Sequence, residues 1–271
     1  MSRETFFKLN RIYLIISLLA GLVLPLDIFQ VEEISHLPVV EVVKPIAISF
    51  EAVERSAINF QAAKTPTQNW SLSAIMVGLY FSISLFFLIK IIIDFLKIFR
   101  LVKTGEKQRE GQFLIITTEG VETPFSFFNY IFINKKMIEN ADYQEIINHE
   151  KAHSIQKHSL DVVSLEILRG MFWLSPVIHF YARSLRNVHE YLADAAVLQY
   201  TGKKHYGQLL ISQTAVINGL KIAHHFNFSQ LKKRIIMMSR NPSQYAALVT
   251  YIIAAPIFLF LIFAFAKPNN P

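Results

Sequence analysis

The sequence predicts an α+β domain inserted between transmembrane α-helices. Two observations predict this fold class. Long uncharged runs lie at both ends of the chain and near position 85, and the charged residues gather between them. Between the second and third apolar runs, a pattern typical of strands is followed by a pattern typical of helices.

The composition limits the chemistry that is available. The 271 residues are 52% apolar, carry a net charge of +7 and include no cysteine. Disulfides, thiolate metal sites and a cysteine nucleophile are therefore excluded, and any metal must be held by His, Asp or Glu. The excess of Lys and Arg fits the cytoplasmic flanks of membrane spans, so we expect no direct nucleic-acid binding.

The first expected element is a transmembrane helix over residues 12–29. Its apolar stretch is about as long as the roughly 17–25 residues that cross a hydrocarbon core. A signal peptide is the alternative, but the run is long for one and no cleavage site of the A-x-A kind follows. Residues 30–72 are polar and mixed, and we expect an extracytoplasmic loop there.

Two further spans are expected over residues 73–99 and 246–266, and basic clusters fix their orientation. These clusters precede the first span, follow the second and precede the third: Arg3, Lys8 and Arg11; Lys97, Arg100, Lys103, Lys107 and Arg109; Lys232, Lys233, Arg234 and Arg240. Three crossings put all of them on the cytoplasmic side of a bacterial inner membrane. Residues 100–245 are then a cytoplasmic domain.

This domain is expected to open with a β-hairpin and to continue with helices. Residues 113–118 are β-branched and apolar, Glu119 and Gly120 supply a turn, and residues 125–133 alternate. The helical pattern begins near Asn140, a plausible N-cap, and a second helix is expected over residues 183–202.

The first helix of the domain carries the H-E-x-x-H motif at positions 149–153. Because four residues make just over one turn, His149 and His153 project from the same helix face and can hold one ion. Glu150 lies beside that face, where it can accept a proton from a water molecule that the metal activates. The alternative is a pair of surface histidines with no ligand.

A catalytic zinc site needs a third protein ligand, and the second helix offers one. Glu190 and Asp194 are four residues apart on one face of that helix. Glu190 is the candidate third ligand, and Asp194 can orient a ligand histidine through its other ring N–H. The alternative is a solvated acidic face on which Glu190 pairs with Arg186.

Four sequence blocks resemble a known family. The segments TPFSFFNYIFI (123–133), HEKAHSIQKHSLD (149–161), HEYLADAAVL (189–198) and LKKRIIMM (231–238) follow in this order. They resemble the β-lactam sensor-transducer and antirepressor family of BlaR/MecR type, in its Bacteroidetes-like version. The motif pair alone also resembles the membrane peptidases that include prenyl-protein endopeptidases and HtpX.

The resemblance implies a gluzincin-like zinc metallopeptidase domain on the cytoplasmic face. It implies His149, His153 and Glu190 as zinc ligands and Glu150 as the catalytic base. Many relatives have an aspartate five residues after the second histidine, where this chain has His158. Asp161, three residues further on, is the candidate for the role of that aspartate, which is to orient a ligand histidine. Relatives usually have one more helix before residue 4 and often a sensor after the last helix, so we expect a shortened N-terminus and no sensor domain.

The expected function is that of a membrane-embedded zinc endopeptidase that works in signalling. Its partners would be the lipid bilayer and a protein substrate, which is either a transcriptional repressor or the chain itself. A general quality-control or processing protease is one alternative. A non-catalytic scaffold with a structural zinc site is the other, although such a site needs a fourth protein ligand that the spacing does not offer. Manganese or cobalt can take the same donors as zinc.

Overall fold

The computed structural model describes residues 5–23, 71–216, 223–241, 243 and 249 of the chain. In chain order its elements are α1 (Phe7–Val23), α2 (Leu72–Thr104), β1 (Glu106–Glu110), β2 (Phe113–Thr118), β3 (Phe125–Phe127), β4 (Tyr130–Asn134), the short 3-10 helix η2 (Lys135–Met137), α3 (Tyr143–Ile155), α4 (His158–Met171), α5 (Pro176–Val197), α6 (Lys203–Val216) and α7 (Ala223–Ser239). The expected extracytoplasmic loop and the expected last span, 246–266, lie almost wholly outside the described residues.

Helix α2 is the longest element, and its side chains are largely exposed. It has 33 residues, and only 6% of its most apolar stretch is buried by the rest of the protein. Among the described helices it is the one that is both long and apolar enough to cross a membrane. Ser71 caps its start, because its hydroxyl accepts a hydrogen bond from the backbone N–H of Ala74.

The four strands form a mixed sheet in the order β1-β2-β4-β3. Strands β1 and β2 pair antiparallel around Gly111, which has a positive φ of 60°. Strands β2 and β4 pair parallel, and β3 pairs antiparallel with β4 at the edge of the sheet.

The expected hairpin between residues 113–118 and 125–133 is therefore wrong. The second of these segments is two strands, because Phe128 adopts a positive φ of 51° and turns the chain back on itself. The partner that β2 has in a hairpin is β1, which the sequence pattern did not reveal because all five of its residues are charged or polar and exposed. The expected N-cap at Asn140 is also displaced, since α3 begins at Tyr143 after Asp142.

Both faces of the sheet are covered by helices. Ile115, Ile131 and Ile133 face the helices α3, α6 and α7 and form the largest core cluster with them. Ile116 and Phe132 face the opposite way and pack against the last turns of α2. Burial on both faces explains why the central strands are almost continuously apolar.

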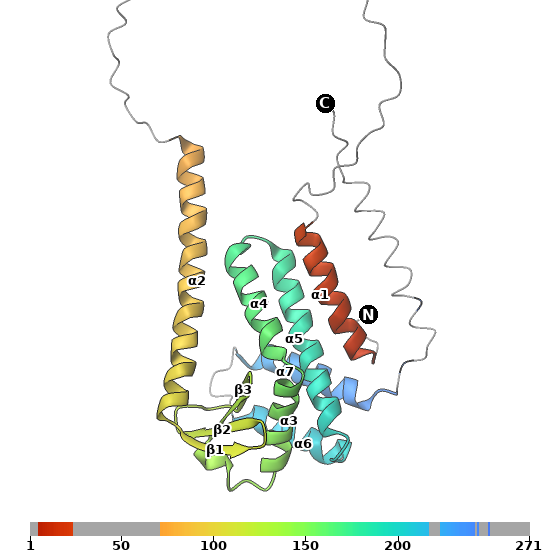
Figure 1. Cartoon of the computed structure of the whole chain (residues 1–271). Helices are drawn as coiled ribbons and strands as arrows, with labels where there is room; N and C mark the ends of the chain where they lie inside the picture. The colour runs from red at the N-terminus through yellow and green to blue at the C-terminus, as the bar shows by residue number, and fades with distance from the viewer. Residues whose placement is uncertain (1–4, 24–70, 217–222, 242, 244–248, 250–271) are drawn as a thin grey trace, which may run out of the picture.

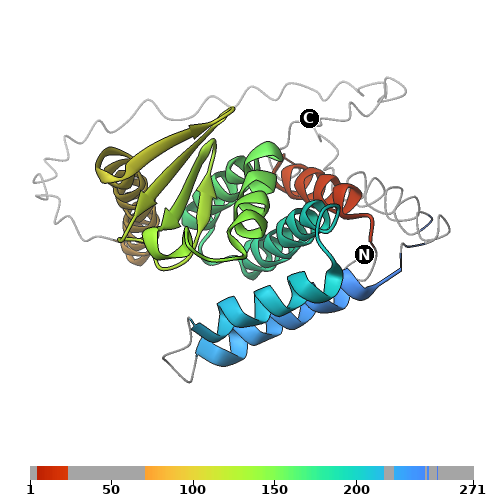
Figure 2. The same cartoon turned by 90° about the horizontal axis from the view of Figure 1, so that it is seen from below.

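The helices α1, α4 and α5 pack together beside α2 (Figure 1). Leu14, Ile15 and Leu18 of α1 contact Leu165, Ala182 and Leu185, which belong to α4 and α5. Helices α6 and α7 lie side by side next to these helices (Figure 2). Helix α5 contacts α1, α3, α4 and α7, so it joins the bundle to the domain beneath it.

Candidate metal centre

Helix α3 presents two imidazoles to one point. Ile147 and Ala152 are buried and fix the helix against its neighbours. The face that carries His149 and His153 lines a cavity. The Nε2 atoms of His149 and His153, one turn apart, lie 3.1 Å from each other.

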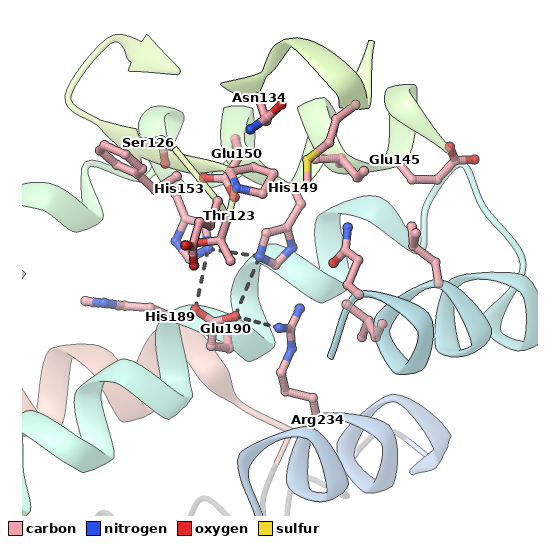
Figure 3. Close-up of a pocket in the computed structure, with 18 of the residues that line it drawn as sticks. Thr123, Ser126, Asn134, Glu145, His149, Glu150, His153, His189, Glu190 and Arg234 are labelled. Atoms are coloured by element: carbon pink, nitrogen blue, oxygen red, sulfur yellow. Dashed lines mark hydrogen bonds and ion pairs between the residues drawn. The ribbon is translucent and has the colours of Figure 1, made fainter. Parts of the chain in front are cut away.

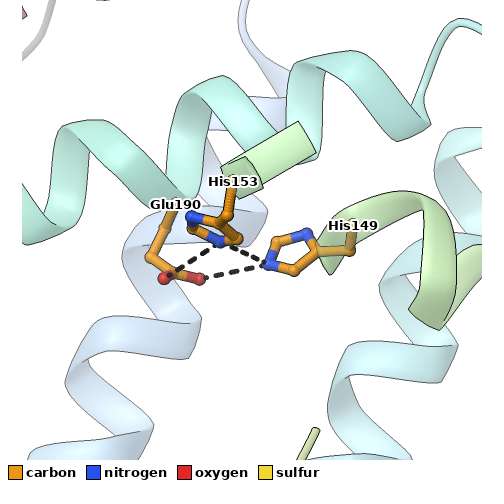
Figure 4. Close-up of side chains that lie close together, drawn as sticks. All are labelled: His149, His153 and Glu190. Atoms are coloured by element: carbon orange, nitrogen blue, oxygen red, sulfur yellow. Dashed lines mark hydrogen bonds and ion pairs between the residues drawn. The ribbon is translucent and has the colours of Figure 1, made fainter. Parts of the chain in front are cut away.

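Helix α5 brings Glu190 to the same point. Its carboxylate oxygens lie 3.6 Å from Nε2 of His149 and 3.7 Å from Nε2 of His153 (Figure 4). One nitrogen or oxygen from each of the three residues falls within 4.8 Å of the others. Arg186, which the sequence offered as the partner of Glu190, pairs instead with Glu166 at 3.7 Å.

The charge states of His153 and Glu190 suit the binding of a cation. Burial, together with the neighbouring His149, lowers the pKa of His153 to about 3, so this imidazole is neutral near pH 7. Burial works to raise the pKa of Glu190, but the hydrogen bond with His149 and the charge of Arg234 outweigh it and hold that pKa well below its usual range. A neutral imidazole and an ionised carboxylate are the forms in which these side chains bind metals.

Glu150 follows His149 in the sequence but its carboxylate lies on the side of the helix nearer the sheet (Figure 3). The residue is 8% exposed and lines the cavity. Burial raises the pKa of Glu150, while the nearby His149 and a hydrogen bond with Ser126 of β3 act in the opposite direction. A carboxylate with a raised pKa is a stronger base than an ordinary one.

Asp194 and His149 are connected mainly by hydrogen bonds to a third residue, Tyr206. The Tyr206 hydroxyl donates to Oδ1 of Asp194 at 2.9 Å. The hydroxyl oxygen of Tyr206 also lies 2.9 Å from Nδ1 of His149. Asp194 itself is 3.5 Å from that nitrogen. With the proton of His149 on Nδ1, the imidazole donates to Tyr206 and leaves Nε2 free for a ligand bond.

Arg234 of α7 closes this side of the site. Its guanidinium donates to both carboxylate oxygens of Asp194 and lies 3.0 Å from Oε2 of Glu190. The pKa of Arg234 rises despite burial, because the hydrogen bonds and charges of these two carboxylates favour its charged form. Figure 3 shows the guanidinium approaching Glu190 from the helix opposite α3.

Asp161 occupies a different position from the one that the sequence suggested. Its Oδ2 lies 2.8 Å from Nε2 of His189 and accepts a hydrogen bond from Arg11 of α1 at 2.7 Å. The second nitrogen of His153 is met by His158 instead, with the two Nδ1 atoms 2.7 Å apart. His158 in turn stacks on His189 at 4.0 Å between ring centroids, so Asp161 acts on His153 only through these two rings.

A cavity of about 870 Å³ opens in front of the cluster. The edge strand β3 and the segment before it form one wall. Residues of α3, α4, α5, α6 and α7 and of the segment between β4 and α3 form the others (Figure 3). The volume is in the range of ligand-binding clefts.

Sequence reasoning did not single out Tyr206 or Arg234. Tyr206 stands in a short helix with no motif around it. Arg234 stands in a basic cluster, which the positive-inside rule explained without a site. The only signal was that Arg234 falls within the block LKKRIIMM, one of the four blocks that carried the family resemblance.

The model of the family described as BlaR1 peptidase M56 matches residues 10–238. No curated protein matches the chain. Because the match covers well over half of the sequence, the chain belongs to this family of membrane metallopeptidases.

Proposed function

We propose that this member of the BlaR1 peptidase M56 family is a membrane-embedded zinc endopeptidase. His149, His153 and Glu190 hold the ion, and Glu150 is the general base. The observation that carries the proposal is the convergence of three ligand atoms within 4.8 Å on a cavity that Glu150 also lines.

The donor set and its spacing fit zinc. Two imidazoles and one carboxylate with an open fourth position are typical of catalytic zinc sites. Bonds of about 2.05 Å in tetrahedral directions separate the ligand atoms by about 3.3 Å. The two Nε2 atoms are 3.1 Å apart, Oε2 of Glu190 is 3.6 Å from that of His149, and Oε1 is 3.7 Å from that of His153, so these distances bracket this value. Among the described residues the group has three members, whereas a structural zinc site normally has four protein ligands.

The reaction proposed is hydrolysis of a peptide bond. A bound zinc ion lowers the pKa of a water molecule and polarises the substrate carbonyl. Glu150 takes the proton from the attacking water and passes it to the leaving amine nitrogen. Tyr206 and Asp194 keep the proton of His149 on Nδ1, and Arg234 holds Glu190 ionised and fixed in direction.

The edge strand β3 is the proposed seat for the substrate backbone. It pairs with β4 on one side only, and Phe125, Ser126 and Phe127 all line the cavity. An extended peptide can add to such an edge as a further strand. Phe128 ends the strand and is anchored at both backbone groups, since its N–H donates to Ser159 and its carbonyl accepts from Ser154.

The proposed location is a bacterial inner membrane, crossed more than once, with the zinc domain toward the cytoplasm. Helix α2 supports one span by length and composition, and α1 is the described part of the expected first span. The proposed substrate is a repressor or another regulatory protein, and the proposed role is in signalling. A quality-control protease is distinguished by its products: a regulator gives one defined cut in one protein, whereas quality control gives many cuts in many.

The test combines metal analysis with a protease assay on purified protein in lipid. The variants are Glu150→Gln and Glu190→Gln, and exposed Glu139→Gln is the matched control. We expect one zinc per chain in the parent, in Glu150→Gln and in Glu139→Gln, and less zinc in Glu190→Gln. Hydrolysis of casein or self-cleavage should fall about 10²–10⁴-fold in Glu150→Gln, which is the usual contribution of a general base. Full zinc content in Glu190→Gln would remove Glu190 from the ligand set, and full activity of Glu150→Gln would remove it as the base.

A further inference from the structure

The turn between α4 and α5 exposes an unusual concentration of large apolar side chains. Five of them lie within ten residues and are 36–71% exposed: Met171, Phe172, Leu174, Val177 and Phe180. Soluble surfaces rarely expose so many neighbouring apolar side chains unless a partner covers them. The turn therefore calls for an apolar partner.

One side of this turn packs against α2. The hydroxyl of Tyr80 donates to the backbone carbonyl of Met171 at 2.5 Å, and the rings of Tyr80 and Trp173 are 5.9 Å apart. Gly170 lies so close to α2 that an added Cβ would be 3.3 Å from the side chain of Phe87. Close packing at a small residue is common between membrane helices.

The other side of the α4–α5 pair packs against α1. Apolar residues of α1 contact Leu165 of α4 and Ala182 and Leu185 of α5. The Tyr181 hydroxyl donates to Ser17 of α1 at 3.0 Å. The α4–α5 turn therefore lies between the two helices to which we assign membrane spans (Figure 1).

The position along α2 gives the depth of the turn. Tyr80 lies eight residues after the start of α2 and ten residues before Lys90, the first charged residue of that helix. At about 1.5 Å per residue these intervals are about 12 and 15 Å. A turn that touches Tyr80 thus lies near the middle of a hydrocarbon core about 30 Å thick.

The ionisable side chains Glu166, Arg169 and His179 on the two sides of the turn are paired, whereas the indole N–H of Trp173 at the turn has no hydrogen-bond partner among the described residues. Arg169 donates to Glu166 at 2.7 Å and to His179 at 3.3 Å, and the second ring nitrogen of His179 lies 3.0 Å from the carbonyl oxygen of Trp173. Ionisable residues inside membranes are tolerated when they are paired in this way.

We propose that α4 and α5 form a re-entrant hairpin whose tip dips into the bilayer between α1 and α2, with lipid hydrocarbon as its partner. This inference rests on the spans assigned under the proposed function. It also sets the height of the metal centre, because Glu190 follows Phe180 by ten residues, about 15 Å along α5. The cluster then lies at the level of Lys90, where the membrane meets the cytoplasm, and the bond to be cut lies at the membrane surface.

The absence of native cysteine allows a direct test with single-cysteine variants. The full chain is reconstituted in vesicles of phosphatidylcholine and phosphatidylglycerol, and each variant is treated with a membrane-impermeant maleimide or a nitroxide label. Leu174→Cys and Phe180→Cys probe the tip. Leu85→Cys on α2 is the lipid-facing control, and Tyr200→Cys, whose residue is 82% exposed, is the water-facing control.

We expect Leu174→Cys and Phe180→Cys to react with the maleimide about 10–100-fold more slowly than Tyr200→Cys. The thiolate is the reactive form, and an apolar environment that raises its pKa by one to two units lowers its fraction by that factor. Nitroxides at the tip should be reached by oxygen more than by a water-soluble nickel chelate, as at Leu85→Cys. Reaction as fast as at Tyr200→Cys would put the tip in water, and a nitroxide shielded from both reagents would mean that protein covers it. Either result overturns the proposal.

A second measurement uses the native side chain. The chain has two tryptophans, so Trp70→Phe leaves Trp173 as the only one. Its fluorescence should be quenched more by lipids brominated deep in the acyl chains than by those brominated near the headgroups, and the reverse order would contradict the proposal. If Leu85→Cys also behaves as a water-facing residue, then α2 does not span the membrane, and this part of the proposed function is rejected together with the hairpin. The zinc and protease assays report on the remainder of the proposed function independently.

Discussion

Replacing Tyr206 by phenylalanine removes one oxygen atom from the centre of the site and changes little else. Tyr206 as a residue is 1% exposed. Its hydroxyl donates to Asp194 and lies 2.9 Å from Nδ1 of His149. Phenylalanine keeps the ring within the core cluster to which Tyr206 belongs. The substitution therefore separates the orientation of His149 from the packing of α6.

The expected loss follows from the two hydrogen bonds. Partners that orient a ligand histidine usually contribute about 10–100-fold to metal affinity. This range corresponds to about 1.4–2.7 kcal/mol of binding free energy. Independently, Asp194 loses a donor to a buried charge, which should lower the free energy of unfolding of the metal-free protein by about 1.5–3 kcal/mol.

The assay is zinc binding in competition with a chelating dye, together with thermal melting with and without zinc. The matched control is Tyr200→Phe, because Tyr200 is 82% exposed and its hydroxyl faces water. We expect the zinc affinity of Tyr206→Phe to fall at least tenfold and that of Tyr200→Phe to stay unchanged. An affinity of Tyr206→Phe within twofold of the parent would refute the reasoning that Tyr206 orients His149.

Three further substitutions test other parts of the structure. Arg234→Met leaves the buried carboxylate of Asp194 and the partly exposed carboxylate of Glu190 without their cation. It should destabilise the metal-free protein by about 3–5 kcal/mol, with zinc restoring part of the loss; thermal melting beside exposed Lys233→Met measures it. Arg11→Met removes the hydrogen bonds from α1 to Asp161 of α4 and to the carbonyl of Gln156 after α3. It should lower the unfolding free energy by about 1.5–3 kcal/mol, and an unchanged melting temperature would exclude these bonds. Gly105→Ala pushes a methyl group into the sheet and should cost about 1–3 kcal/mol. Gly207→Ala, which meets no atom within 4 Å in a helix, should instead stabilise by about 0.5–1 kcal/mol, so equal losses at both glycines would contradict the packing described.

Periodicity along the chain was informative wherever one helix face carries the signal. The spacing of His149 and His153, and that of Glu190 and Asp194, each follows one turn, and the structure brings the first three of these residues together. The strand at 113–118 also has the expected bounds. In these places a local pattern and the tertiary structure agree, so the pattern alone is enough.

The pairing of the strands could not be predicted from the periodicity of the sequence. The parallel register of β2 and β4 depends on the turn at Phe128, a residue type that seldom adopts a positive φ. Strand β1 has no apolar face and is held by its ladder with β2 and by ion pairs of Glu106 with Lys135 and of Glu110 with Lys151. A strand that contributes no buried side chain leaves no hydrophobic alternation to detect.

Arg234 and Tyr206 were missed for a different reason. Both act through contacts with residues far away in the sequence, Arg234 over an interval of 40 residues to Asp194 and Tyr206 over 57 to His149. An arginine in a basic cluster and a tyrosine in a short helix look ordinary until the fold brings them to a site. The position beside Nδ1 of His153, expected for Asp161, is taken by His158, the first residue of α4, while Asp161 faces Arg11 of α1.

Thr5 and Ser243 exchange two hydrogen bonds, each backbone N–H donating to the hydroxyl of the other residue, across 238 positions of the chain. Arg234, nine residues before Ser243, and Arg11, six after Thr5, both contact the surroundings of the metal cluster. The segment that leads into α1 is thus tied to a residue that follows α7. The two histidines of α3 are synthesised before Glu190 and Arg234, so the cluster can assemble only after α5 and α7 have been made.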